Sequence, residues 1–290
     1  MKIPSEQDGN AEAIEAWNTV LFDKFCQYRD ILTTGLGLHG EVAMDRGAPK
    51  PGAHVLDVGC GFGDTTVVLG RLVGETGRAT GVDCASRFID AARREASEAG
   101  AKNVNFLVAD VQEGELGGPY DLAFSRMGVM FFASPVAALR NIRRSLKSGG
   151  RLSMAVWRKK EENPFLAAVE NRVLEIVTVP EKTEEVTCGP GPFSMASADV
   201  VSAQILKAGF VRPTFERFDG EIFVGKDLAS AIEFALSIGP AGEVMRLAGE
   251  EGAKKRPEVV AAVGEVLAPF VRATGVYGMS SSWIITAQAP

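Results

Sequence analysis

Carboxylates follow three segments of the chain that have the composition of buried strands. Asp57, Asp83 and Asp110 each come directly after such a segment, at residues 54–56, 78–82 and 104–109. The carboxyl ends of parallel strands meet at one edge of a sheet, so these three acids are expected to lie close together. A carboxylate accepts hydrogen bonds from hydroxyl groups and attracts ammonium groups. The sequence therefore predicts a site for a polar ligand at that edge.

The segment after Asp57 is rich in glycine and leads into a helical pattern. Gly59, Gly61 and Gly63 stand at alternate positions, and Asp64 begins the helix. Glycine leaves the backbone open to a ligand and adopts φ values that other residues disfavour. A dinucleotide fingerprint needs a glycine where Asp64 stands, and a carboxylate there would repel a pyrophosphate at the helix N-terminus. The turn therefore argues against an NAD(P)-dependent oxidoreductase and favours a cationic ligand without phosphate, such as S-adenosylmethionine (SAM).

Five motifs, in order, resemble those of the class I SAM-dependent methyltransferases. LDVGCGFG at residues 56–63 resembles motif I, and Asp83 and Asp110 match the family acids that contact the ribose hydroxyls and the adenine amino group. YDLAFSR at residues 120–126 resembles motif IV, and LKSGGRL at residues 146–152 resembles the turn into the fifth strand. Within the family, SRMGVMFF and ENPF make the chain similar to the bacterial ubiquinone/menaquinone-type small-molecule methyltransferases.

This resemblance implies an enzyme that moves a methyl group from SAM to a small, aromatic or hydrophobic acceptor by in-line displacement, giving S-adenosylhomocysteine. It implies that the glycine turn lies against the methionyl part of the cofactor and that Asp57 attracts the cofactor's ammonium group. Ser125 and Arg126 are expected near the methyl donor. A non-catalytic, regulatory SAM-binding domain is the alternative function. The cofactor-binding residues expected on this basis are Asp57, Gly59, Cys60, Gly61, Gly63, Thr65, Asp83, Cys84, Asp110, Val111, Ser125 and Arg126.

No motif identifies the residues that bind the acceptor or take its proton. Aromatic and methionine side chains near the expected cleft are the candidates for acceptor binding: Trp17, Tyr28, Met130, Phe132, Trp157 and Phe193. The candidates for a catalytic role are Arg126, His39 and Tyr28. Structural alternatives stay open, because Arg126 could pair with an acid such as Asp57, His39 could be a loop residue, and Phe132 could pack in the core. A lid carboxylate could also act as the base, or alignment of the reactants could suffice.

The periodicity of apolar residues predicts the elements that position these side chains. Spacings of three and four predict an amphipathic helix over residues 11–33, then a flexible loop at Gly35–Gly40 and a short helix at residues 41–46. Alternating strand and helix patterns over residues 54–157 predict an α/β, Rossmann-like, mostly parallel sheet with helices on both faces. The family resemblance implies seven strands in the order 3-2-1-4-5-7-6, the last one antiparallel.

These elements predict four consecutive parts of the chain. They are an N-terminal helical cap at 1–48, a SAM-binding core at 49–158, a lid insertion at 159–195, and a completion of the core at 196–290. The last part contains a helical insertion at residues 227–273, with its third helix expected at 257–273. Within the lid, a helix is expected at residues 165–177, and residues 180–192 are rich in turn-forming types.

The composition of the chain indicates which kinds of partner and which cellular compartment to expect. The 290 residues carry a net charge of −6 with a pI of about 5.2, which argues against a nucleic-acid partner. No run of 18 apolar residues is present and MKIPSEQDGN lacks a signal-peptide core, so no membrane span is expected. Cys26, Cys60, Cys84 and Cys188 lack metal-ligand spacing, so no metal is expected. We expect a cytoplasmic monomer or homodimer that acts on a small molecule.

Overall fold

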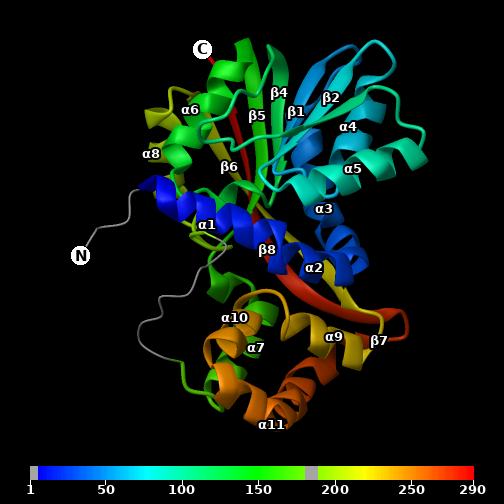
Figure 1. Ribbon diagram of the computed structural model, residues 1–290, viewed down its shortest axis with the longest axis vertical. Coiled ribbons are helices and arrows are strands. Elements are labelled where there is room, and N and C mark those ends of the chain that lie inside the picture. Colours follow the sequence, from blue (N-terminus) through cyan, green and yellow to red (C-terminus); the bar gives the residue numbers. More distant parts are fainter. Residues whose placement is uncertain (1–5, 180–188) are drawn as a thin grey trace.

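The computed structural model describes residues 6–179 and 189–290, and its centre is one eight-stranded sheet (Figure 1). The strand order is β3-β2-β1-β4-β5-β8-β6, with the two-residue β7 pairing with β8 outside this path. Strands β1 to β5 pair in parallel, whereas β8 runs antiparallel to β5 and β6. Without β7 this is the expected order, 3-2-1-4-5-7-6. The strands are β1 (His54–Val58), β2 (Arg78–Asp83), β3 (Val104–Val108), β4 (Tyr120–Arg126), β5 (Leu146–Trp157), β6 (Val211–Gly225), β7 (Val271–Arg272) and β8 (Gly275–Gln288).

Helices cover both faces of the sheet. Helices α3 (Arg29–Gly47), α4 (Asp64–Val73) and α5 (Ser86–Glu98) pack in sequence along one face, and α6 (Pro135–Ser145) and α8 (Ala198–Lys207) pack together on the other. The central strands are buried between these layers and supply fully buried side chains such as Leu56, Phe124 and Ile285. Two covered faces explain why β1 and β4 read as continuous apolar runs rather than as alternating patterns.

The N-terminal segment differs from the expected single helix and loop. It forms α1 (Glu6–Asn18), α2 (Val20–Gln27) and α3, and the segment Gly35–Gly40 lies inside α3. Gly35 and Gly40 of this segment serve close packing, because a Cβ atom on Gly35 would lie 2.7 Å from the Phe223 carbonyl oxygen and one on Gly40 would lie 2.8 Å from Arg126 Cδ. The prediction of a flexible loop and a separate short helix was therefore wrong.

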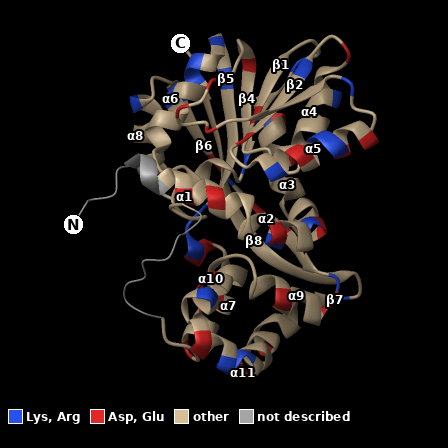
Figure 2. Cartoon of the chain, viewed as in Figure 1, with Lys and Arg blue, Asp and Glu red and all other residues tan. Residues whose placement is uncertain are grey.

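The long strands β6 and β8 extend past the sheet core and carry a second group of helices (Figure 1). This group consists of α7 (Pro164–Leu174), α9 (Leu228–Ala235), α10 (Pro240–Leu247) and α11 (Gly249–Leu267). Helix α11 begins before Pro257, where we expected its start, and it ends at Leu267 rather than at Ala273, because η3 (Ala268–Phe270) and β7 follow. Its buried residues on both sides of the proline, Gly252 and Val259, lie in a helix packed against its neighbours, and this packing outweighs the interior proline. Basic and acidic residues lie close together along α11 (Figure 2). Lys255 pairs with Glu251, and Arg256 pairs with Glu233 of α9.

The expected lid is only partly within the described residues. Its helix is α7, preceded by the short helix η2 (Lys160–Glu162), whereas residues 180–188, which include Cys188, lie outside them. Residues 189–192 form no regular helix or strand, in agreement with their composition. Across the described ranges, no single helix has the length and apolar composition to cross a membrane; α9 and α10 meet that test only together, as a pair bent by 62°.

Candidate functional site

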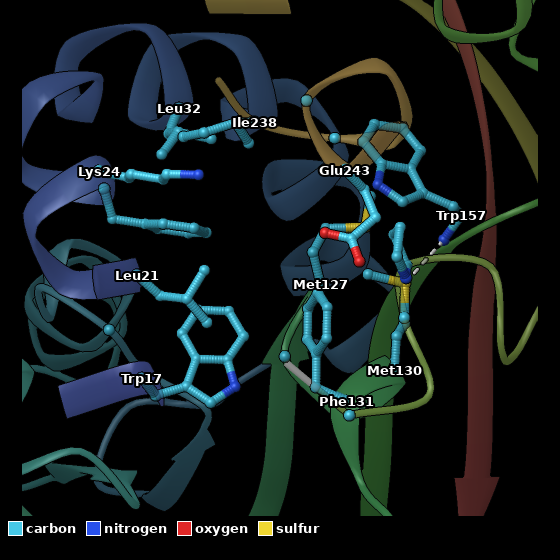
Figure 3. A pocket seen from close by; sticks show the side chains of 18 of the residues that line it. Trp17, Leu21, Lys24, Leu32, Met127, Met130, Phe131, Trp157, Ile238 and Glu243 are labelled. Carbon is cyan, nitrogen blue, oxygen red and sulfur yellow. Dashed lines mark hydrogen bonds between the residues drawn. The ribbon is translucent and has the colours of Figure 1, made fainter. Parts of the chain in front are cut away.

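The main cavity has a volume of about 1290 Å³ and lies between the carboxyl edge of the sheet and the helices around it. The turns after β1, β2 and β3 form one wall. Helices α1 and α2 form another, and α7 and α10 close the side toward the second helical group. Figure 3 shows that the labelled side chains enter this space from several of these elements. The topology therefore brings residues that are far apart in the sequence into one site.

The glycine turn after β1 has the backbone geometry that its composition predicts. Gly59, Gly61 and Gly63 have φ values of +67°, +52° and +79°, which disfavour any other residue type. A Cβ atom on Gly63 would also lie 2.7 Å from the Phe106 ring. Gly59, Cys60 and Gly61 line the cavity, whereas Gly63 lies behind them. A ligand in the cavity can thus approach the main chain of the turn.

Asp57 lies beneath the glycine turn and not at the cavity surface. It is 1% exposed, and its Oδ2 accepts hydrogen bonds from the hydroxyls of Thr65 (2.7 Å) and Thr66 (2.6 Å). Its Oδ1 is buried and has no hydrogen-bond partner among the described residues. Burial raises the pKa of Asp57 to about 6, since the low-dielectric surroundings disfavour the charged form. Asp57 and Thr65 were both expected to contact the cofactor, but neither lines the cavity. They stabilise the glycine turn from the side that faces away from the cavity.

The acids after β2 and β3 line the cavity as expected. Asp83 Oδ2 accepts a hydrogen bond from the Gly61 amide and Oδ1 accepts one from the Ala85 amide, each at 3.0 Å. An ionised carboxylate has about four acceptor positions, so Asp83 can still bind two hydroxyl groups. Burial raises the pKa of Asp83 and that of the Cys84 thiol beside it. The Gly61 bond fixes this acid relative to the glycine turn.

Asp110 also receives a contact from the N-terminal cap. Its Oδ2 accepts a hydrogen bond from Asn10 Nδ2 of α1, and its Oδ1 accepts one from the Gln112 amide at 2.9 Å. Asp110, Val111 and Gln112 all line the cavity. Helix α1 therefore lies directly over the end of the site that the family assigns to adenine.

Ser125 and Arg126 are the last two residues of β4, and only Arg126 faces the cavity. Ser125 is fully buried, and its hydroxyl donates to the Val58 carbonyl oxygen at 2.7 Å. Arg126 lines the cavity and forms a bidentate ion pair with Asp64, with Nη–Oδ distances of 2.8 and 3.0 Å. The acid that Arg126 pairs with is thus Asp64 rather than Asp57.

Most of the expected acceptor-binding side chains line the cavity, and they are Trp17, Met130, Phe132, Trp157 and Phe193. The ring of Trp17 packs edge-on against Phe131 at a centroid distance of 5.1 Å, and the Trp157 amide donates to Met130 Sδ at 3.3 Å. These contacts hold an apolar wall over the ends of β4 and β5 (Figure 3).

Two of the catalytic candidates lie outside this wall. Tyr28 is 8% exposed, and its hydroxyl bonds to the Glu233 carbonyl oxygen and to Ser237 Oγ. His39 is fully buried in α3, with its ring nitrogens 2.7 and 2.8 Å from the hydroxyls of Ser282 and Ser280. Burial lowers the pKa of His39 to about 4. Both side chains therefore join the N-terminal helices to other elements, and of the three candidates Arg126 is the one at the cavity.

Lys24 and Glu243 are cavity residues that the sequence analysis missed (Figure 3). A signal for Lys24 was present, because it stands three residues after Leu21 and seven after Trp17, on the apolar face of the expected helix. A charged residue on such a face commonly has a partner or a ligand. No comparable signal marks Glu243, whose position depends on how α10 packs against α7.

Comparison with known proteins agrees with this geometry. Residues 49–206 match the family described as "Methyltransferase domain", which is more than half of the chain. The chain belongs to the class I SAM-dependent methyltransferases. This confirms the resemblance seen in the motifs, and SAM is the methyl donor of the family.

Individual relatives match different shares of this chain. Aklanonic acid methyltransferase DauC of Streptomyces sp. (strain C5) is 34% identical over 115 residues, which are 39% of this chain and 52% of DauC. The ubiquinone/menaquinone biosynthesis C-methyltransferase UbiE of Ectopseudomonas mendocina is 27% identical over 212 residues, 69% of this chain and 81% of UbiE. The YcgJ protein from Bacillus subtilis shares the fold, with a TM-score of 0.52, 16% identity and coverage of 88% and 97%. The chain thus spans only about half of DauC.

The residues at the cavity are chemically suited to a cationic methyl donor. The buried Oδ1 of Asp57, which has no hydrogen-bond partner among the described residues, lies beneath the glycine turn, and Asp83 and Asp110 line the cavity. Asp64 lines the cavity too, but its charge is paired with Arg126. These carboxylates would repel a pyrophosphate and attract a sulfonium or ammonium group. The main chain at Gly59 and Gly61 is open to the cavity, so the described residues fit SAM.

Proposed function

We propose that the protein transfers the methyl group of SAM to a small aromatic or hydrophobic acceptor, leaving S-adenosylhomocysteine. One observation carries this proposal: the glycine turn with Asp83 and the apolar wall with Trp17 and Trp157 line one continuous cavity. Its volume of about 1290 Å³ exceeds the range of about 300–1,000 Å³ that is usual for a single small-molecule site. Donor and acceptor can therefore occupy it together.

The cofactor-binding roles follow from the contacts of the individual residues. Asp83 uses its remaining acceptor positions for the ribose hydroxyls, and Asp110 with the Val111 amide reads the adenine edge. The main chain of Gly59 and Gly61 lies along the methionyl part. Asp57 acts through its charge from beneath the turn, because it has no surface in the cavity.

The chemistry needs alignment more than it needs a protein nucleophile. SAM supplies an electrophilic methyl group on a cationic sulfur. The chain's part is to hold the acceptor atom in line with that group, which can lower the barrier by about 7–11 kcal/mol. The apolar side chains of Trp17, Phe132 and Trp157 exclude water from the reacting atoms.

Substitution of Asp83 tests the assignment of the cofactor site. We expect Asp83→Ala to weaken SAM binding by about 10- to 100-fold, since hydrogen bonds to a charged group contribute about 1.5–3 kcal/mol. Asp90→Ala on the exposed face of α5 is the matched control and should leave the affinity unchanged. Isothermal titration with SAM, and separately with NAD, measures both.

Two outcomes of these titrations would contradict the proposal. Wild-type protein that binds NAD but not SAM would exclude a methyltransferase. Unchanged SAM affinity in Asp83→Ala would refute the ribose site. SAM binding without S-adenosylhomocysteine formation over a broad panel of phenols, amines and quinols would favour a non-catalytic SAM-binding domain instead.

A further inference from the structure

Lys24 places an ammonium group in an otherwise apolar part of the cavity. Its side chain is half-buried, leaves α2 three residues after Leu21, and extends into the cavity. In Figure 3 the labelled side chains around it are the apolar Leu21, Leu32 and Ile238, which come from three different elements. Apolar surroundings make a cation costly unless an anion accompanies it.

The other half-buried cations of the cavity wall have a carboxylate partner. These pairs are Arg29–Glu95, Arg126–Asp64, Lys160–Glu170 and Arg246–Glu243. Within the described part of the chain, no carboxylate lies within the 4.0 Å of an ion pair from Lys24 Nζ. Lys159, the other wall cation without such a pair, is exposed and can be solvated. Lys24 is therefore the cation that a bound ligand can neutralise.

The Glu243 carboxylate extends into the cavity from α10 (Figure 3). Arg246 neutralises it through hydrogen bonds of 2.8 and 2.9 Å, so Glu243 is not the counterion of Lys24. An anionic group on a ligand would be attracted by Lys24. A ligand with one acidic end would thus bind with that end at Lys24.

We propose that Lys24 binds an anionic oxygen, a carboxylate, on the methyl acceptor, so that the acceptor is an aromatic or hydrophobic acid. This inference rests on the proposed function and names the acceptor class of the same cavity. Lys24 serves the acceptor rather than the donor because Leu32 and Ile238 beside it belong to α3 and to the α9–α10 connection, and not to the turns that carry the cofactor acids. Its role is to anchor and orient, separate from the atom that receives the methyl group.

A matched pair of probes tests this inference. We would titrate 1-hydroxy-2-naphthoic acid and its neutral amide into protein saturated with S-adenosylhomocysteine. Wild-type protein should bind the acid at least tenfold more tightly than the amide. Lys24→Met should reduce that ratio to about one, and Lys24→Arg should keep most of it. Lys159→Met, which removes the exposed wall cation, should leave the ratio unchanged.

Two further measurements keep the test decisive. Thermal unfolding should show Lys24→Met at least as stable as wild type, because it removes an unpaired, half-buried charge, and Lys24→Gln serves as a second neutral variant. Equal binding of acid and amide by wild type, or no binding of either, would overturn the inference. The inference would also be overturned if Lys24→Met bound SAM more weakly but still preferred the acid to the amide. Lys24 would then contact the methyl donor and not the acceptor. Failure of wild-type protein to bind SAM would instead overturn the proposed function.

Discussion

At the scale of single residues, Arg126 connects the end of β4 to the start of α4. Its guanidinium holds Asp64, the first residue of the helix that follows the glycine turn, and its aliphatic part fills the space left by Gly40 of α3. Both partners are largely shielded from water, with side-chain exposures of 14% and 27%. The pair therefore ties together three elements that meet at the cavity.

Removal of the charge of one partner of this pair should lower the free energy of unfolding more than removal of both charges. We expect Arg126→Met to lower the free energy of unfolding by about 2 kcal/mol, because Asp64 keeps its charge without a counterion. Arg126→Met combined with Asp64→Asn should recover part of that loss. Urea unfolding of the two single variants and the double variant gives the coupling energy. A coupling below about 0.5 kcal/mol, the level of an exposed ion pair, would mean that solvent already screens the charges.

The catalytic candidates show which residue-level predictions a single sequence supports. Asp83 and Asp110 were placed correctly at the cavity because the end of a parallel strand lies at the sheet edge whatever the packing around it. His39 and Tyr28 were not, because their positions depend on which side of a helix faces which neighbour. Polar contacts with Ser282 and Glu233, more than 200 residues away, decide that, and no local pattern encodes them.

At the scale of elements, the close approach of two turns shapes the cofactor site. The turn after β4 contains Gly128, and the turn after β1 contains Gly59. A Cβ atom on Gly128 would lie 3.0 Å from Gly59 Cα and 3.0 Å from the Val58 carbonyl oxygen. Gly128 has φ −91°, which any residue can adopt, so contact alone accounts for glycine there. The spacing of the motif I glycines is readable from sequence, but this contact between two turns is not.

Alanine at Gly128 should separate the two turns. We expect Gly128→Ala to cost about 1–3 kcal/mol of stability, as overpacking usually does, and to weaken SAM binding. Gly37→Ala is the matched control, since Gly37 lies inside α3 and an added Cβ would meet nothing within 4 Å. That control should gain about 0.5–1 kcal/mol from its better helix propensity. Urea unfolding and SAM titration measure both variants. Equal stability and equal SAM affinity of Gly128→Ala and Gly37→Ala would refute the importance of the contact between the two turns.

At the scale of the whole molecule, the sheet was predictable and the enclosure around it was not. The alternation of strand and helix patterns predicted a parallel sheet with helices on both faces, and the family resemblance implied the strand order. The N-terminal helices and the group α7, α9, α10 and α11 enclose the cavity through contacts between distant segments, such as the hydroxyl of Tyr28 with Ser237. Amphipathic patterns predicted that most of these helices exist but not which faces would meet over the sheet edge.

The pH dependence of stability combines two buried groups of the molecule that act in opposite directions. The pKa of Asp57 is raised to about 6, so the folded state binds its proton more tightly than the unfolded chain, and this contribution to stability falls as pH rises from about 4 to 6. The pKa of His39 is lowered to about 4, so the unfolded chain binds that proton more tightly. The His39 contribution is present above about pH 6.5 and is lost as pH falls toward 4.

Replacement of His39 by glutamine should therefore change how stability varies with pH. Wild-type protein should lose about 2 kcal/mol more than His39→Gln between pH 7 and pH 5, because protonation of the unfolded wild-type chain competes with folding. Asp219 attracts the protonated form of His39, but the burial of the ring outweighs this attraction. Free energies of unfolding in urea at the two pH values measure it for both proteins. Parallel pH dependence would show that His39 titrates in the folded state as it does in water, which would contradict its burial between the serine hydroxyls.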